Sequence, residues 1–293
     1  MAIDFCNLGS GSGGNSTVLR TSGGAILIDA GFGPRTTAQR LGGTGLAVTD
    51  IKAVVLTHLD HDHFKDNWLA TLQKHNIKVF CCARKRRQIV ESAAASELTE
   101  RYPDRPAIAS LVHGFRSHFE PLDGLLFEPI SLAHDDTGSH GFVISCGRFR
   151  IGFATDLGHV TEELIEKFCG LDLLALESNY DIEMQKSSDR PWFLKQRIMG
   201  GSGHLSNAQA FAAVCGILDR TVATCGEERL PRHIVLLHRS RQCNCPRLLR
   251  DLFTQDPRIA PRLVLTDQYE CTPWLRLRST EPLAGEQMAL SWR

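Results

Sequence analysis

Long apolar runs are absent from this sequence of 293 residues. No stretch approaches the roughly 18 consecutive apolar residues that a membrane-spanning helix needs, so we expect no membrane partner. The first six residues, Met-Ala-Ile-Asp-Phe-Cys, also lack the basic region and the apolar core of a signal peptide. A cytoplasmic protein is therefore the expectation.

The chain also has no net charge, because its 33 Lys and Arg residues balance its 33 Asp and Glu residues. Proteins that bind nucleic acid through bulk charge usually show a strong basic excess, so an anionic partner must here be held by local groups or by metal ions. The apolar content of 42% excludes a disordered chain. No low-complexity linker divides the sequence, which favours a single domain over residues 1–293.

A disulfide framework is a third absence, although there are ten cysteines. Cys81 and Cys82 are adjacent, and Cys243 and Cys245 lack the second pair of a structural zinc knuckle. Most of the cysteines are therefore expected to be reduced and buried as small apolar side chains. A metal or redox role for Cys243 and Cys245 is the alternative.

Short apolar runs bounded by glycine and polar residues predict many strands with helices between them. Strands are expected at residues 3–8, 17–21, 25–28, 53–56, 79–82, 126–132, 142–146, 149–154, 173–176 and 234–237. Helices are expected at residues 65–75, 161–168, 206–219 and 246–253, and residues 103–121 are expected to be irregular. This alternation indicates an α/β fold.

Residues 9–15, Gly-Ser-Gly-Ser-Gly-Gly-Asn, join the first two predicted strands. The segment lacks the Gly-Lys-Ser/Thr ending of a P-loop and leads into strand-like residues, which favours a tight turn between strands. Close approach of this backbone to a substrate is the alternative.

The densest set of potential metal ligands is the segment 57–63, Thr-His-Leu-Asp-His-Asp-His, which directly follows a predicted buried strand. Imidazole and carboxylate ligands suit zinc, iron or manganese. Side chains alternate along an extended loop, so His58, Asp60 and Asp62 can point to one side, and His63 can join them where the helix begins. Two metal ions could share this loop.

More candidate ligands follow other predicted strands. His134, with Asp135 and Asp136, comes after the strand at 126–132, Asp156 comes after the strand at 149–154, and His238 comes after the strand at 234–237. A sheet presents the ends of its strands at one edge, where loop residues carry binding groups. Together with the segment 57–63, these positions predict a metal centre at that edge.

On these motifs the sequence resembles the metallo-β-lactamase-fold hydrolases, whose signature is His-x-His-x-Asp-His followed by His, Asp and His at strand ends. It is most similar to their YycJ/WalJ branch of metal-dependent 5′-exonucleases. The matching stretches lie between about residues 5 and 270, at residues 8–15, 27–31, 57–63, 154–156, 177–179, 194–198, 203–207 and 237–238. The resemblance implies a four-layer αββα sandwich with two divalent metal ions, zinc or manganese.

The resemblance also implies the ligands. His58 and His134 would hold one ion, Asp62, His63 and His238 would hold the other, and Asp156 would bridge them. Asp29 would support the metal loop without ligating. His204 would face the substrate. The alternative is that His204 is only a neighbour of the N-terminus of the following helix, which Ser206 is expected to cap.

One position departs from the family signature. Asp60 stands where the family has its second histidine, and His61 fills a normally variable position. Side-chain alternation favours Asp60 as the ligand, with His61 as the alternative. Three carboxylates (Asp60, Asp62 and Asp156) would then face two divalent ions, and we expect such a site to tolerate manganese.

The resemblance makes hydrolysis of a phosphodiester by a metal-bridging hydroxide the leading hypothesis, with DNA as substrate and Asp62 and His204 as catalytic residues. Lys195 and Arg197 are candidates for binding phosphate, and Trp192 and Phe193 for stacking on a base. The basic run at residues 84–87 has a solvated helix face as its alternative.

Two other functions remain open at this point. One is a hydrolase of a small non-nucleic ester, cyclic phosphodiester or lactone, because a fold does not fix a substrate. The other is a metal-stabilised binding module without turnover. Nothing in the sequence indicates an oligomeric state.

Overall fold

The computed structural model describes residues 2–95, 104–135 and 138–278, and within them the strands form two sheets. The first sheet contains β1 (Ile3–Gly9), β2 (Ser16–Thr21), β3 (Gly24–Ile28), β4 (Ile51–Val55), β5 (Lys78–Cys82), β6 (Val112–Phe115) and β14 (Leu275–Leu277). The second contains β7 (Phe119–Leu122), β8 (Leu125–Leu132), β9 (Ser139–Cys146), β10 (Phe149–Ala154), β11 (Leu173–Glu177), β12 (His233–Leu237) and β13 (Leu263–Leu265). Their strand orders are β14-β1-β2-β3-β4-β5-β6 and β13-β12-β11-β10-β9-β8-β7.

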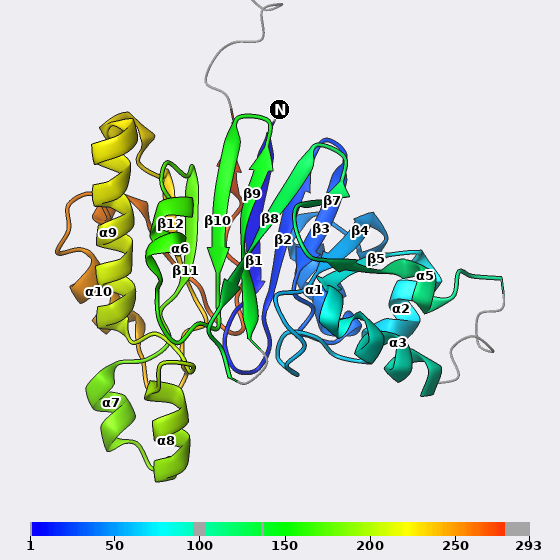
Figure 1. Cartoon of the computed structure of the whole chain (residues 1–293), viewed down its shortest axis with the longest axis horizontal. Helices are drawn as coiled ribbons and strands as arrows, with labels where there is room; N and C mark the ends of the chain where they lie inside the picture. Colours follow the sequence, from blue (N-terminus) through cyan, green and yellow to red (C-terminus); the bar gives the residue numbers. More distant parts are fainter. Residues whose placement is uncertain (1, 96–103, 136–137, 279–293) are drawn as a thin grey trace, which may run out of the picture.

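Helices cover the outer face of each sheet (Figure 1). Those beside the first sheet are α1 (Pro34–Thr44), α2 (Trp68–His75), α3 (Arg86–Ala95) and α5 (Ile108–Leu111). Those beside the second sheet are α6 (Glu162–Lys167), α9 (Asn207–Cys225) and α10 (Pro246–Phe253). The arrangement confirms the predicted four-layer αββα sandwich. A pair of short helices, α7 (Ile182–Ser187) and α8 (Trp192–Met199), projects beyond one end of it.

Three clusters of buried apolar side chains hold the four layers together. The central cluster joins the two sheets, with Phe5 and Ile26 from the first sheet and Phe127 and Phe142 from the second, and each of these side chains is fully buried. Trp68 of α2 lies in the cluster under the first sheet. The third cluster packs α6, α9 and α10 against the second sheet. Burial of apolar surface at three interfaces therefore fixes the sandwich.

Parallel pairing brings the carboxyl ends of several strands to one edge. In the first sheet β3, β4, β5 and β6 run parallel, and in the second sheet β10, β11, β12 and β13 do. Helices and the partner sheet cover both faces of these strands, which explains why β11 and β12 read as nearly continuous apolar runs. The loops that leave this edge carry the candidate metal ligands.

Three of these loops begin with a residue in the left-handed backbone region. Asp29 after β3, Asp156 after β10 and His238 after β12 have φ values of 62°, 54° and 52°. This conformation is uncommon for residues other than glycine and persists where the surrounding structure enforces it, often at functional sites. It turns the chain sharply away from the sheet at each of these three positions.

The predicted strands and helices all occur, with shifted ends and one clear error. The helix expected from residue 65 begins at Trp68, because residues 61–63 and 66–67 form turns. The segment expected to be irregular contains α5, β6 and β7. Its short strands have few apolar residues, and they are stabilised by pairing with β5 and β8 rather than by a strong local pattern.

The cysteines are free within the described residues, as predicted, but fewer are buried than expected. Cys6, Cys81, Cys146 and Cys243 are buried, whereas Cys225 is exposed and the others are partly exposed. No helix among the described residues combines the length and the apolar character that crossing a membrane requires.

Candidate metal centre

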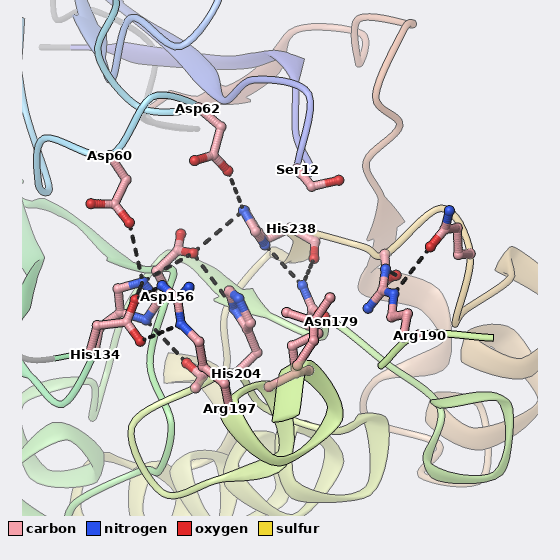
Figure 2. Close-up of a pocket in the computed structure, with 16 residues that line it drawn as sticks. Ser12, Asp60, Asp62, His134, Asp156, Asn179, Arg190, Arg197, His204 and His238 are labelled. Carbon is pink, nitrogen blue, oxygen red and sulfur yellow. Dashed lines mark hydrogen bonds and ion pairs between the residues drawn. The ribbon is translucent and has the colours of Figure 1, made fainter. Parts of the chain in front are cut away.

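The predicted metal ligands gather at the carboxyl edge of the two sheets, where five of them, Asp60, Asp62, His134, Asp156 and His238, line one cavity (Figure 2). The loop after β4 supplies four of them, and the loops after β8, β10 and β12 supply one each. They are His58, Asp60, Asp62, His63, His134, Asp156 and His238. His58 and His238 are 180 positions apart in the chain. Each belongs to a set of side chains whose ligand atoms lie close enough together to hold a metal ion, and these sets share His63 and Asp156.

One group consists of His58, Asp60 and His134. The Oδ2 atom of Asp60 lies 3.8 Å from Nε2 of His58 and 3.9 Å from Nε2 of His134. Nε2 of His58 is buried and has no hydrogen-bond partner among the described residues. A buried nitrogen without a partner is costly, and a metal ion at this position would remove that cost.

A second group consists of Asp62, His63 and His238. Oδ2 of Asp62 lies 3.7 Å from Nε2 of His63 and 3.3 Å from Nε2 of His238. Both imidazoles are buried, and the carboxylate of Asp62 is partly exposed to the cavity. The three ligand atoms face one another as they would around one ion.

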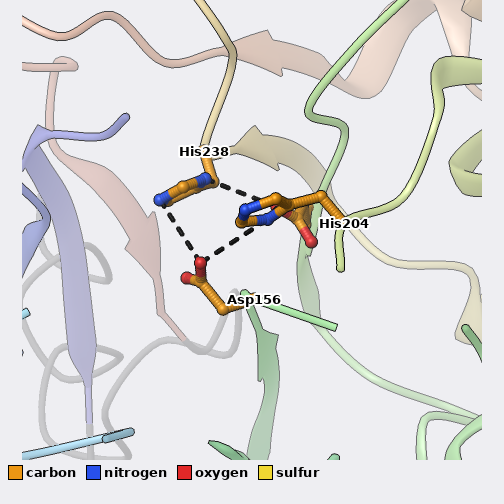
Figure 3. A group of neighbouring side chains, drawn as sticks. Asp156, His204 and His238 are labelled. Atoms are coloured by element: carbon orange, nitrogen blue, oxygen red, sulfur yellow. Dashed lines mark hydrogen bonds and ion pairs between the residues drawn. The ribbon is translucent and has the colours of Figure 1, made fainter. Parts of the chain in front are cut away.

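Asp156 lies between the two groups. Its Oδ2 atom is 3.0 Å from Nε2 of His63, and its Oδ1 atom is 3.9 Å from Nε2 of His134 and 3.5 Å from Nε2 of His238. Figure 3 shows the carboxylate beside His204 and His238. One carboxylate that contacts ligands of both groups has the placement of a bridging ligand.

The spacing of these atoms fits a bound metal. Ligands at about 2.0–2.2 Å from a tetrahedral zinc ion lie roughly 3.4 Å from each other. The distances given above, from 3.0 to 3.9 Å, fall around that value. The ligand spacing and the orphaned Nε2 atom of His58 therefore both fit divalent metal ions.

Asp29, expected to support the metal loop, contacts two residues of that loop, Thr57 and His63. Its Oδ2 atom lies 2.8 Å from Nδ1 of His63, and its Oδ1 atom accepts a hydrogen bond of 2.9 Å from the backbone N–H of Thr57. A hydrogen on Nδ1 of His63 that is donated to Asp29 leaves Nε2 free to bind a metal. Asp29 therefore fixes both the loop and the orientation of this imidazole.

His204 faces the same cavity and is held by Glu177, a residue for which the sequence predicted no role. Oε1 of Glu177 lies 2.7 Å from Nδ1 of His204, and Oε2 accepts a hydrogen bond of 3.1 Å from the backbone N–H of Leu157. Glu177 is fully buried, at 0% exposure. Oε1 of Glu177 also lies 3.4 Å from Nδ1 of His238. Glu177, His204, His238 and Asp156 lie close enough together to hold an ion, but we assign Glu177 to orienting the two imidazoles because its oxygens already contact them.

Neighbouring carboxylates raise the pKa of two imidazoles in the centre, His238 and His63. Burial disfavours the charged form of His238, but Asp156, Asp62 and Glu177 outweigh it and raise its pKa to about 10. Burial likewise opposes protonation of His63, yet Asp156 and Asp29 raise its pKa well above the usual value. In the absence of metal, protons therefore occupy imidazoles that a metal would need.

The pKa of His204 is also raised, because the attraction of Glu177 and Asp156 exceeds the cost of burial. His58 behaves differently. Burial and the neighbouring His63 lower its pKa well below the usual value. His58 is therefore neutral and ready to bind a metal, whereas His204 is ready to carry a proton.

Asp60 and His61 are the two candidate ligands at the position that departs from the family signature, and the structure places them differently. Asp60 lines the cavity, and its carboxylate lies beside His58 and His134. His61 is exposed, in the turn at residues 61–63, and belongs to no metal-competent group among the described residues. These positions favour Asp60 as the ligand.

The basic candidates occupy different places. Arg197 lines the cavity and forms an ion pair with Asp135, whereas Nζ of Lys195 donates a hydrogen bond of 2.7 Å to the carbonyl oxygen of Lys186 and lies outside the cavity lining. Trp192 and Phe193, whose core role was the alternative, are both 73% exposed on α8.

The basic run at residues 84–87 is split by the structure. Arg86 donates hydrogen bonds to the carbonyl oxygens of Val112 and Ala109, and Arg87 pairs with Glu91 on the exposed face of α3. Its other two members, residues 84 and 85, line a separate cavity between the sheets. The run is therefore not one continuous phosphate-binding surface.

Sequence reasoning missed three polar residues that contact the imidazoles of the cluster. Besides Glu177, these are Asn15, whose Nδ2 atom lies 3.0 Å from Nε2 of His63, and Asn179, whose Nδ2 atom lies 2.9 Å from Nδ1 of His238. Asn15 ends the glycine-rich segment, which is a turn between β1 and β2 as predicted. Glu177 and Asn179 stand at and just after the end of β11, a position that marks them as candidates, but only their contacts show which imidazole each one reaches. Asp136 lies outside the described residues.

A fold with two facing sheets, and a cluster of histidines and aspartates at their edge, define a class of metal-dependent hydrolases. Comparison with protein families agrees, because the Beta-lactamase superfamily domain matches residues 25–224. The chain belongs to this family and is a hydrolase of the β-lactamase superfamily, whose fold implies divalent metal ions.

Relatives with curated names are exonucleases. The chain is 25% identical over 252 residues to Exodeoxyribonuclease YycJ of Bacillus anthracis, which covers 85% of this chain and 87% of the relative. It is also 25% identical to Exodeoxyribonuclease WalJ of Streptococcus pneumoniae, covering 73% and 76%. Among solved structures, the metallo-β-lactamase fold protein YhfI of Bacillus subtilis has a TM-score of 0.64 at 13% identity, covering 92% of this chain and 98% of that one.

Proposed function

We propose that the protein is a phosphodiesterase that uses two divalent ions, zinc or manganese, and acts as a 5′-exonuclease on DNA. The names of the relatives support a nucleic-acid substrate. The cavity supports a phosphodiester, because it places Arg190 near the imidazole and carboxylate cluster, beside Arg197, which is paired with Asp135. The cavity has a volume of about 400 Å³, which suits one nucleotide better than a duplex.

The chain's own residues divide the work of hydrolysis. Asp62, His63 and His238 would hold one ion and His58, Asp60 and His134 the other, with Asp156 shared. Bound divalent ions acidify water and withdraw charge from a phosphoryl oxygen. Asp29 keeps the imidazole of His63 in place through the contact described above.

His204 would protonate the departing oxygen. Glu177 occupies Nδ1 of this imidazole, which leaves Nε2 as the atom available on the cavity side. Glu177 and Asp156 raise the pKa of His204 against the cost of burial, which favours the protonated imidazole that a general acid requires. Because Glu177 fixes the orientation of His204, little conformational entropy is lost when the imidazole transfers its proton.

The observation that carries this proposal is the shared position of Asp156. Its two oxygens lie 3.0 Å from His63 and 3.9 Å from His134, so one carboxylate touches both ligand groups. A site for a single ion would need only one of these groups. Paired metal sites are common in enzymes that hydrolyse phosphodiesters.

The test is hydrolysis of 5′-labelled single- and double-stranded DNA by purified protein with zinc, with manganese and without metal. We expect release of labelled nucleotides only with metal, and loss of that activity in Asp62→Ala. Asp123→Asn, in the exposed turn between β7 and β8, is the matched control and should remain active.

Two results would contradict the proposal. Activity on small esters or lactones that responds little to added salt, with none on DNA, would identify a small-molecule hydrolase, because binding of nucleic acid weakens steeply with salt. Stoichiometric metal with no activity on any ester or phosphodiester would identify a binding module.

A further inference from the structure

A second, smaller cavity opens beside the metal centre. It has a volume of about 280 Å³ and is lined by Ser12, Arg190, Arg241 and Gln242. All of these except Arg241 also line the metal cavity, so the two cavities are continuous. Figure 2 shows Ser12 and Arg190 on the side of the cavity away from Asp60 and His134.

The guanidinium of Arg190 lies where the two cavities meet, and its hydrogen-bond partners there are neutral side chains. Its Nε atom donates to Oε1 of Gln242 at 3.1 Å, its Nη1 atom to Oε1 of Gln185 at 3.1 Å, and its Nη2 atom to Oγ of Ser240 at 3.4 Å. Gln185 is fully buried, which anchors the guanidinium. No carboxylate of the described residues forms an ion pair with Arg190, so its charge remains available to an anion.

Arg241 brings a second charge to the same cavity. Its guanidinium lies 5.0 Å from the centre of the Tyr269 ring, and in the part of the chain that the structure describes it has no acidic partner. The nearby Arg239 differs, because Asp267 neutralises it at 2.8 Å. Two of the three arginines around this loop therefore present uncompensated charge to the cavity.

The glycine-rich turn provides neutral donors on the opposite wall. Within the described ranges, neither the backbone N–H nor the hydroxyl of Ser12 has a hydrogen-bond partner. The turn around it is fixed, because the N–H of Gly11 donates to Asn15 at 2.9 Å and the N–H of Gly13 donates to Gln268 at 2.7 Å. Ser12 therefore offers two donors from a rigid turn.

We propose that this cavity, formed by Ser12, Arg190, Arg241 and Gln242, is a phosphate-binding subsite. It takes the phosphate of a polynucleotide next to the one that lies at the metal centre. Two guanidinium groups and a backbone N–H are the groups that proteins use to bind phosphate. The inference rests on the proposed function, because only a substrate with more than one phosphate can reach both cavities.

The first test measures binding without metal and without turnover. Binding of a short single-stranded oligonucleotide to the metal-free protein is followed by fluorescence anisotropy at several salt concentrations. Each lost phosphate contact lowers the slope of log K against log salt by about 0.7 for a single strand. We expect this loss in Arg190→Gln and Arg241→Gln, and recovery in Arg190→Lys, which keeps the charge.

Arg148→Gln is the charge-matched control for both variants. Arg148 is exposed and precedes β10, whereas Asp156 follows that strand, so a whole strand separates this position from the metal centre. We expect it to keep the wild-type slope. Wild-type slopes in both Arg190→Gln and Arg241→Gln would overturn the subsite. Arg241 is exposed, so the second variant guards against a misfolded first variant.

The second test separates the subsite from the proposed function. Bis(4-nitrophenyl) phosphate has a single phosphate and cannot occupy both cavities. With metal added, Arg241→Gln should raise KM for the oligonucleotide about 10-fold or more while leaving kcat/KM for the small ester unchanged. Equal effects on both substrates would overturn the subsite. If wild-type protein hydrolyses neither substrate, the proposed function fails, and the binding test still decides the subsite.

Discussion

Oε1 of Glu177 lies 2.7 Å from Nδ1 of His204, and the carboxylate is fully buried while the imidazole faces the cavity. A buried acid that fixes a histidine at the edge of a metal cluster makes a proton donor of defined orientation. The pair comes from the end of β11 and from the loop before α9, which are 27 residues apart in the chain.

Removing the imidazole should affect turnover and not metal content. His204→Ala is expected to lower kcat on DNA by about 10²–10⁴-fold, because proton transfer to the departing oxygen is lost. Glu177→Gln should lower it less, since the amide keeps a hydrogen bond to Nδ1 but not the charge. Bound metal in His204→Ala, measured by mass spectrometry, should stay near the wild-type amount. Unchanged turnover in His204→Ala would remove this residue from the mechanism.

Loss of the Asp29 carboxylate should lower the affinity of the protein for metal. Asp29→Asn keeps the size of the side chain and suits the left-handed backbone at φ 62°, but weakens the hydrogen bond to Nδ1 of His63. Loss of such a supporting group typically costs 10–100-fold in affinity, about 1.4–2.7 kcal/mol. Competition with a coloured chelator measures it. Affinity equal to that of the control Asp123→Asn would contradict this role.

The position that departs from the family signature can be tested directly. Asp60→Ala should lose one bound ion, whereas His61→Ala should keep both, since His61 is exposed and lies outside the cavity lining. With Asp60 as a ligand, manganese should support activity, because carboxylates suit this metal. Metal content of the two variants decides the first point. Activity that is highest with zinc and absent with manganese would count against the second.

Uptake of metal should release protons. Without metal, His238 has a pKa of about 10 and is protonated at neutral pH, and the pKa of His63 is also raised. Metal binds only the neutral imidazole, so the apparent affinity should increase as the pH rises. Titration calorimetry in two buffers that differ in ionisation enthalpy counts the protons. An affinity that does not change between about pH 6 and pH 8 would contradict this charge state.

Much of the site could be predicted from the sequence, because its ligands follow a local rule. His238 comes directly after a buried apolar strand and Asp156 comes two residues after another, and parallel strands end at one edge. Asp29 was placed beneath the metal loop by resemblance, and the structure shows the contact with His63. Periodicity also located β10 and β12 within a residue or two.

Other features depend on contacts that no local pattern encodes. Glu177 ends an apolar strand, and only the packing of α9 against the second sheet shows that it faces His204. Lys195 and Arg197 are two residues apart on α8, yet one lies outside the cavity lining and the other lines it. The strand β6 was missed because its partner β5 lies about 30 residues earlier in the chain, and β7 was missed because its hairpin with β8 contains a register shift and follows no regular alternation.

The proposed function requires that residues distant in the sequence bind a pair of metal ions around Asp156. Anomalous diffraction at the manganese edge from crystals grown with manganese tests it most directly. We predict two peaks, one among His58, Asp60 and His134 and the other among Asp62, His63 and His238, with Asp156 in contact with both. A single peak, or peaks away from these residues, would contradict the account.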